Sequence, residues 1–333
     1  MLATGTASAA NADFMCSQGL WTARSRPLEG SAGWRRGSVV DALRRLGGVA
    51  TRAELRSFVS KRQLRRAVAQ GRVLRPRPGR YLLRDVNAAT AVAHELSAVV
   101  SHRSAALAHG WKVKTVPPKP EITVPRGRKI AVGVRPRARI WSSLVDPRDA
   151  AEGITSPVRT VVDCARHLPF DEALAIADSA LRSRRVAARD LATAAQQVRG
   201  PGRPRVLRVL AHASSKAANP FESVLRAIAL DVPGLDLRPQ VGIAVAGGER
   251  VTPDLVDVAL GIVVEADSHE FHTGREQLVV DCWRYDELTL ASWDVYRFTY
   301  EQVMWRQGWV ASVLLRAEAK ARATQHVRAA LQH

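Results

Sequence analysis

The chain has 333 residues, of which 46% are hydrophobic, and a formal net charge of +19. This length suits two or three domains, and the apolar content is enough for real cores, so a wholly disordered chain is excluded. No apolar run approaches the roughly 20 residues that a membrane span needs, and the first residues lack the order of a signal peptide. We therefore expect a cytoplasmic protein without a membrane partner.

The charge is distributed unevenly along the chain. Residues 35–84 hold 15 Lys and Arg against 2 Asp and Glu, whereas residues 219–333 hold 11 against 16. Scattered surface arginines explain a bias of this size poorly. One region is therefore expected to meet phosphates, and the other to gather carboxylates around a cation. Three widely spaced cysteines indicate neither a zinc site nor a disulfide framework.

Residues 37–85 predict three helices followed by a basic hairpin. Apolar residues at helical spacing indicate a first helix over 39–46, and Thr51 (with Glu54 three residues on) and Ser60 are candidate caps of two more. This order is typical of a winged helix-turn-helix, which places one helix in the major groove and a basic wing along the phosphates. The candidate DNA contacts lie on the third helix and the wing: Lys61, Arg62, Arg65, Arg66, Arg75, Arg77 and Arg80.

This module resembles the winged-helix domain of AbiEi-type abortive-infection antitoxins. The resemblance is carried by Val40-Asp41-Ala42-Leu43, by Gly48-Val49-Ala50-Thr51 and by the segment from Gly71 to Tyr81. It implies DNA binding or autoregulation, with a cognate toxin as a candidate partner, and it implies no catalysis.

The middle segment, residues 86–212, predicts an α/β connector. We expect a helix over 94–111, strands over 121–124 and 130–135, and helices over 160–168 and 170–181. His102 and His109 are seven residues apart and are interpreted as structural histidines without a catalytic role. The turn-forming stretch Arg199-Gly200-Pro201-Gly202-Arg203-Pro204 marks the next boundary.

Acidic residues lie at the ends of two predicted strands in the last third of the chain. Asp254 begins one strand, and Glu265 and Asp267 end the other, where they are expected to share one face. A carboxylate at the end of an apolar strand is costly to desolvate unless a cation or a donor meets it. Magnesium, or alternatively manganese, held by such carboxylates would neutralise the transition state of phosphodiester hydrolysis and activate water.

The spacing resembles the Asp…(Asp/Glu)-x-Lys motif of restriction-endonuclease-like folds, with Asp267 where the Lys is expected. A stronger resemblance, over about a hundred residues from Asn219 to Val313, is to uncharacterised domains related to very-short-patch-repair endonucleases. The segments that carry it are 264–268, Phe271-His272, 281–288 and 293–299.

By position, the resemblance implies that Asp254 and Glu265 are metal ligands and that Glu222 is an acid carried on a helix. Asp267 takes the place of the Lys, and His272 is a candidate acid/base or phosphate contact. Glu222 also stands where a capping box requires Glu, so its structural and catalytic interpretations are equally supported.

Three further polar positions have structural interpretations. Asp257 is expected to face solvent or cap a turn. Asp281 and Arg284 are expected to form an ordinary i,i+3 surface pair.

The expected fold class is α/β, a multi-domain α+β arrangement. It comprises a tail over 1–36 that is disordered or follows a misassigned start, a winged helix-turn-helix over 37–85, the connector over 86–212, and a restriction-endonuclease-like α/β/α core over 213–333. Two functions remain open. One is a magnesium-dependent deoxyribonuclease without a small-molecule cofactor; the other is a non-catalytic, antitoxin-like regulator built on an inactive nuclease fold.

Overall fold

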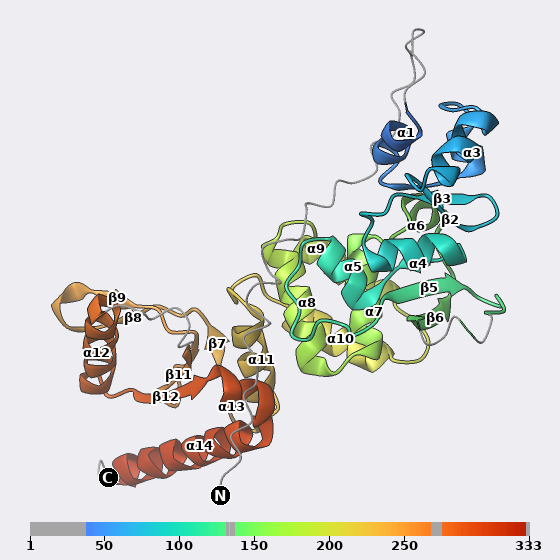
Figure 1. Ribbon diagram of the computed structural model, residues 1–333. Helices are drawn as coiled ribbons and strands as arrows, with labels where there is room; N and C mark the ends of the chain where they lie inside the picture. The colour runs from blue at the N-terminus through green and yellow to red at the C-terminus, as the bar shows by residue number, and fades with distance from the viewer. Residues whose placement is uncertain (1–37, 131–132, 134–136, 268–274, 331–333) are drawn as a thin grey trace, which may run out of the picture. The chain divides into compact units, whose positions relative to one another are not determined.

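The computed structural model describes residues 38–130, 133, 137–267 and 275–330, with the side chains of 275–278 excepted. The tail expected over 1–36 lies outside these residues. The protein is a multi-domain α/β protein (Figure 1), as predicted. Its chain forms two compact units: unit 1 contains residues up to Val100, Ala108–Gly110 and Ile122–Gly153, and unit 2 contains Ser101–Leu107, Trp111–Glu121 and Ile154–His333. The segment 86–212 contributes to both.

Unit 1 begins with the predicted helices and hairpin. Their cores meet through Leu43, Leu55, Leu64 and Tyr81. The elements are α1 (Val39–Arg45), β1 (Val49–Thr51), α2 (Arg52–Leu55), α3 (Lys61–Ala69), β2 (Leu74–Arg77) and β3 (Arg80–Leu82). The three strands form a sheet in the order β1-β3-β2.

Capping explains where these helices begin. The Thr51 side chain accepts from the backbone N–H of Glu54, and the Glu54 carboxylate accepts from the backbone N–H of Thr51 at 2.6 Å. Ser60 caps α3 in the same way, with Gln63 as its partner. Both predicted caps are confirmed. Strand β1 was not predicted, because its three residues are held by pairing with β3 rather than by a local pattern.

The rest of unit 1 is a second three-stranded sheet with flanking helices. Its elements are α4 (Ala88–Leu96), β4 (Val99–Val100), β5 (Glu121–Pro125), β6 (Arg139–Ser143) and α6 (Pro147–Glu152), and the strand order is β4-β5-β6. The predicted strand over 121–124 is confirmed, whereas the single helix predicted over 94–111 is wrong, because β4 pairs with β5 and interrupts it. The strand predicted over 130–135 falls mostly outside the described residues, and Ile130 itself is not in a strand.

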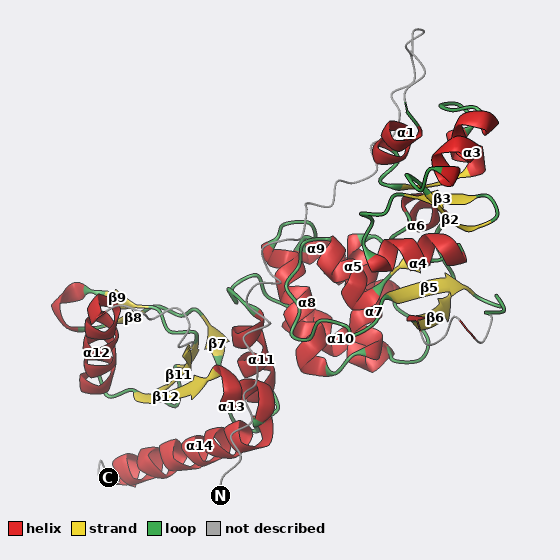
Figure 2. Ribbon diagram, viewed as in Figure 1, coloured by secondary structure: helices red, strands yellow, loops and turns green. Residues whose placement is uncertain are grey.

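Helices dominate the first part of unit 2 (Figure 2). They are α5 (His102–Ala108), α7 (Pro157–His167), α8 (Phe170–Arg182), α9 (Ala188–Gln197) and α10 (Arg203–His212). Trp111, Val161 and Ile176 are in their shared core. The helices predicted over 160–168 and 170–181 are confirmed as α7 and α8.

The second part of unit 2 is a mixed sheet with helices on both faces. Its elements are α11 (Pro220–Ala229), β7 (Arg238–Pro239), β8 (Ile243–Ala244), a 3-10 helix (Ala246–Gly248), β9 (Arg250–Val251), β10 (Leu255–Asp257), β11 (Ile262–Asp267), α12 (Arg275–Leu290), β12 (Asp294–Thr299), α13 (Tyr300–Trp305) and α14 (Gln307–Ala330). The strand order is β12-β11-β10-β7, and β11 pairs with β12 in parallel and with β10 antiparallel.

Alternation along β11 divides the two faces of this sheet. Val264 packs with Leu225 of α11 and Leu314 of α14, whereas Val263 packs with Leu288 of α12. Figure 1 shows α12 and α11 on opposite sides of β11. Glu265 and Asp267 therefore share the α12 face with Val263, as the two-residue period of a strand requires.

A buried ion pair joins the two parts of unit 2. Arg226 of α11 donates to both carboxylate oxygens of Asp178 on α8, at 2.8 and 2.7 Å, and to the backbone oxygen of His212 at 2.5 Å. Asp178 is fully buried and Arg226 is 5% exposed. The helical layer and the sheet therefore share a charged contact that water does not reach.

Candidate metal centre

Asp254 and Glu265 meet where β10 and β11 pair. Asp254 directly precedes β10, and the antiparallel register, Leu255 opposite Val264, brings it beside Glu265. The Asp254 Oδ2 atom accepts from the backbone N–H of Ala266 at 2.9 Å, and the Glu265 Oε2 atom lies 3.4 Å from the Asp254 nitrogen. The two predicted metal ligands are thus brought together by main-chain contacts.

Gln240 belongs to the same site, although the sequence analysis did not identify it. Its backbone N–H donates to the Asp254 carbonyl at 3.0 Å, and its side-chain amide donates to Asp254 Oδ1 at 3.2 Å. Both carboxylate oxygens of Asp254 therefore accept hydrogen bonds, which fix the orientation of its carboxylate.

Glu265 is the most buried acid of the site, at 4% exposure. Burial raises its pKa above the ordinary value; the nearby Arg284 guanidinium opposes this rise, and the negative charge of Asp254 adds to it. A carboxylate in this position is most stable when it is protonated or when a cation lies beside it.

Arg284 is a cation that the sequence analysis placed elsewhere. Its Nη2 atom lies 2.6 Å from Glu265 Oε1 and donates to the Thr252 carbonyl at 3.1 Å. The sequence suggested a surface pair between Arg284 and Asp281; in the structure the Arg284 guanidinium binds Glu265. Asp281 and Arg284 are three residues apart on α12. The Arg284 guanidinium nevertheless reaches the sheet on which α12 packs.

Glu222 lies in the first turn of α11 and binds the residues that begin this helix. Its carboxylate accepts from the Ala218 N–H at 2.7 Å and from the Asn219 amide at 2.8 Å, and its own N–H donates to Asn219. Burial raises its pKa to about 7; the Ala218 hydrogen bond lowers it, and Asp254 raises it further. Asn219 is the cap of α11, and the Glu222 carboxylate binds Ala218 N–H and the Asn219 amide rather than the Asn219 backbone N–H that a full capping box requires.

Asp267 has a partner of its own. Its Oδ2 atom lies 2.5 Å from Arg297 Nη2, and the Arg297 guanidinium lies 4.1 Å from the centre of the Tyr285 ring. Asp267 shares a strand face with Glu265, but its contacts are separate from those of Asp254. The position where a Lys was expected is thus an ion pair in which Arg297 supplies the positive charge.

Two other predicted positions complete the region. Asp257 accepts from the backbone N–H groups of Leu260 at 3.0 Å and Asp236 at 2.7 Å, and it is 2% exposed. It caps the turn, as one of its two interpretations had it, and does not face solvent. His272, the candidate acid/base, lies outside the described residues.

The donor set suits a hard divalent cation. Within the described residues, no group of three or more His, Cys, Asp or Glu side chains is placed to hold one metal ion. Magnesium, however, usually keeps several water ligands and binds through one or two carboxylates. Asp254 and Glu265 fit that pattern, because two carboxylates meet there and one of them is buried.

The raised pKa of Glu222 predicts that this residue contributes to the stability of the fold in a pH-dependent way. Its pKa is about 7 in the fold against an ordinary value of 4.5, so the folded state binds the proton more tightly. Its stabilising contribution is full below pH 4.5 and is lost as the pH rises through 7. Because the side chain is only partly buried, we expect Glu222→Gln to remove about 1 kcal/mol of the fall in unfolding free energy between pH 5 and pH 8.

Urea titrations at both pH values measure this effect, and Glu249→Gln, at an exposed acid, is the matched control. A fall in stability that is equal in Glu222→Gln and the wild type would contradict the assignment.

The basic module of unit 1 presents most of its predicted contacts to solvent. Lys61, Arg62, Arg65 and Arg66 on α3 and Arg75 on β2 are exposed. Arg77 is exposed and forms a long ion pair, 3.7 Å, with Glu95. Arg80 differs: it is half-buried, donates to the Ser97 hydroxyl, and lies 3.4 Å from the His94 ring. The Arg80 guanidinium is thus engaged inside unit 1.

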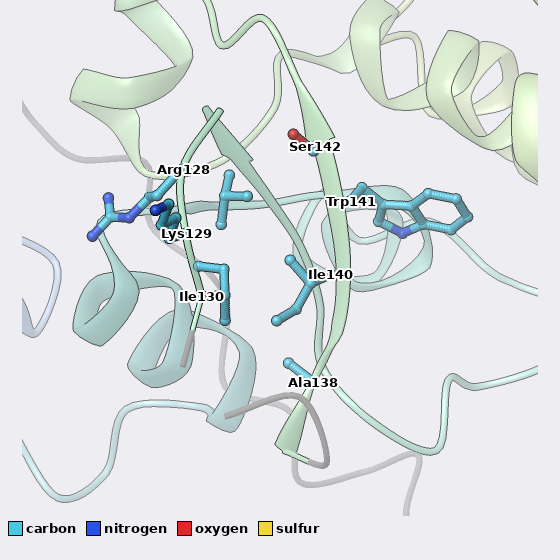
Figure 3. Close-up of a pocket in the computed structure, with 8 residues that line it drawn as sticks. Arg128, Lys129, Ile130, Ala138, Ile140, Trp141 and Ser142 are labelled. Carbon is cyan, nitrogen blue, oxygen red and sulfur yellow. The ribbon is translucent and has the colours of Figure 1, made fainter. Parts of the chain in front are cut away.

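A separate pocket of about 610 Å³ lies in unit 1 beside β6. Ile130 and Ile140 face each other in it, and Arg128 and Lys129 lie at one side (Figure 3). None of the predicted acidic residues lines this pocket, so it is not the candidate metal centre.

Relatives and a solved structure from Mycobacterium tuberculosis are among the proteins that resemble this chain. The uncharacterized proteins Rv2248 and MT2308, from two strains of Mycobacterium tuberculosis, are each 30% identical over 193 residues, or 57% of this chain and 70% of the relative. The crystal structure of the RV2827C protein from Mycobacterium tuberculosis aligns with 56% of this chain and 78% of that chain, at 13% identity and a TM-score of 0.33. No family model matches the chain. In the described part of the chain, every helix is too short or too polar to cross a membrane.

Proposed function

We propose that this chain, which belongs to the same family as the uncharacterized Mycobacterium tuberculosis protein Rv2248, is a magnesium-dependent endonuclease that hydrolyses DNA in the cytoplasm. The observation that carries the proposal is the meeting of Asp254 and the buried Glu265 on β10 and β11, the two inner strands of a sheet with helices on both faces. A divalent cation bound there would activate water and neutralise charge on the scissile phosphate.

The protein residues divide the remaining work. Asp254 and Glu265 hold the cation, and Gln240 fixes the carboxylate of Asp254. Glu222, whose pKa of about 7 is close to neutral, is suited to exchange a proton with an attacking water. Arg297 supplies fixed positive charge beside Asp267, in the region where related folds carry a Lys.

A nicking assay tests this proposal. The full chain is incubated with supercoiled plasmid and either MgCl₂, MnCl₂ or EDTA. We expect conversion to the open-circular form with either metal and none with EDTA. No conversion under any condition, by a folded protein, would contradict the nuclease proposal.

The basic module is proposed to hold the enzyme on duplex DNA. In a plot of the logarithm of the DNA-binding constant against the logarithm of the salt concentration, each phosphate that the protein neutralises makes the slope steeper by about 0.9. Replacement of four exposed side chains by Gln is therefore expected to reduce this slope by about 3 and to weaken binding at low salt by at least tenfold. The four are Lys61, Arg62, Arg65 and Arg66.

Fluorescence anisotropy with a labelled duplex at several salt concentrations measures the slope. A matched control removes four exposed arginines of unit 2: Arg185, Arg189, Arg205 and Arg316. The module is excluded as the DNA-binding surface if both quadruple variants bind alike.

Two observations favour a second function, an antitoxin-like DNA-binding regulator with an inactive nuclease fold and a cognate toxin as partner. Arg284 already neutralises Glu265, and Asp267 stands in place of the Lys. The nicking assay separates the two functions, because the regulator would bind DNA through the basic module without cleaving it.

A further inference from the structure

The guanidinium of Arg284 lies on the carboxylate that the proposed function assigns to a metal ion. It contacts Glu265 Oε1 at 2.6 Å, and Glu265 is almost fully buried. In the described residues, this ion pair is the one that Glu265 forms. Arg284 is thus the counter-ion that makes the buried carboxylate tolerable to the fold.

A divalent cation and this guanidinium compete for the same oxygen. Both require the lone pairs of Glu265, and their like charges repel strongly at close range in a site shielded from water. A divalent cation that binds both Asp254 and Glu265 must therefore displace the Arg284 guanidinium from Glu265 and must also lose some of its own water ligands.

We propose that Arg284 is a displaceable counter-ion, which holds the acidic pair in the absence of metal and leaves Glu265 when a divalent cation binds. This inference rests on the proposed function, because it assigns a regulatory step to the same metal centre. Arg284 is a positioning residue here: it sets the affinity of the centre for its metal.

The structure offers Arg284 a second carboxylate. Glu287 is three residues further along α12, and residues at this spacing are neighbours on a helix. In the described structure, the Oε2 atom of Glu287 is buried without a hydrogen bond, and so is the Nε atom of Arg284. An Arg284 side chain that left Glu265 could therefore satisfy both atoms by turning along its own helix.

Metal affinity tests this inference without reference to cleavage. Isothermal titration with MnCl₂ on the full chain gives the dissociation constant for Mn²⁺. We expect Arg284→Gln to bind Mn²⁺ about tenfold more tightly than the wild type, because the competitor is gone. Arg284→Lys, which keeps the charge but loses the planar fork, is expected to fall between the two and serves if the Gln variant does not fold.

Glu287→Gln should act in the opposite direction. It removes the group that receives Arg284, so we expect Mn²⁺ to bind a few times more weakly, and the effect should vanish in the Arg284→Gln background. Lys320→Gln, which removes a cation from an exposed pair with Asp294 in the same unit, is the control and should leave the affinity unchanged.

The outcomes separate this inference from the proposed function. If Mn²⁺ binds the wild type and is lost in Glu265→Gln, but Arg284→Gln binds no more tightly than the wild type, the counter-ion inference is wrong and the metal centre stands. If neither the wild type nor Arg284→Gln binds Mn²⁺, both are wrong. An affinity that is unchanged in Glu287→Gln would contradict the role given to Glu287.

Discussion

Asp254→Asn and Glu265→Gln are each expected to reduce magnesium-dependent nicking of plasmid DNA by about 100-fold or more, since a bound metal contributes several kcal/mol to the transition state and about 1.4 kcal/mol is tenfold in rate. Each variant keeps the size of its side chain and removes one negative ligand. The Asn side chain can still accept from the Ala266 N–H, so the pairing of β10 and β11 is preserved.

Glu249→Gln is the matched control, because it removes an exposed acid from the same unit. We expect it to nick at the rate of the wild type. Circular dichroism and thermal melting establish that each variant is folded before rates are compared. Nicking that persists in both Asp254→Asn and Glu265→Gln would show that the cleaving centre lies elsewhere.

Arg226→Ala is expected to lower the free energy of unfolding by about 3–5 kcal/mol, because it leaves the fully buried Asp178 without its counter-ion. Asp178 would keep its bond from the Ser214 N–H, at 2.8 Å, but would lose both bonds from Arg226. Urea denaturation followed by tryptophan fluorescence measures the change.

Two comparisons make this prediction specific. Arg208→Ala breaks an exposed pair with Asp231 and should cost no more than about 1 kcal/mol. A double variant with apolar residues, Asp178→Leu with Arg226→Met, should recover much of the loss, since apolar packing can replace a buried ion pair. A cost for Arg226→Ala no larger than that for Arg208→Ala would contradict the structural role of the pair.

Local patterns in the sequence were enough for much of the fold. Capping residues fixed the beginnings of α2 and α3, because a cap involves side chains only three positions apart. The acids of the centre were also identified, since an apolar strand that ends in carboxylates is conspicuous. Asp257 was also identified as a candidate cap of the turn, because its partner Leu260 is only three positions away.

Long-range contacts could not be predicted in this way. Arg284 and Gln240 reach the centre from elements 19 and 14 residues away from their partners, and one chain alone does not indicate such pairings. Arg80 is a further example. Its charge suggested a DNA contact, but its guanidinium donates to the hydroxyl of Ser97, 17 residues away, inside unit 1. The contact of a charged side chain can be predicted from the sequence when its partner is a nearby residue or when the side chain lies in solvent.

The Asp178–Arg226 pair also determines which fragment of the chain could fold when it is moved into another protein. A fragment cut at residue 213 would carry Arg226 into solvent contact without the acid of α8, and it would expose the apolar side of α11. A fusion protein that borrows this sheet would therefore need the helices from Ile154 onward, together with α5 and the segment from Trp111 to Glu121.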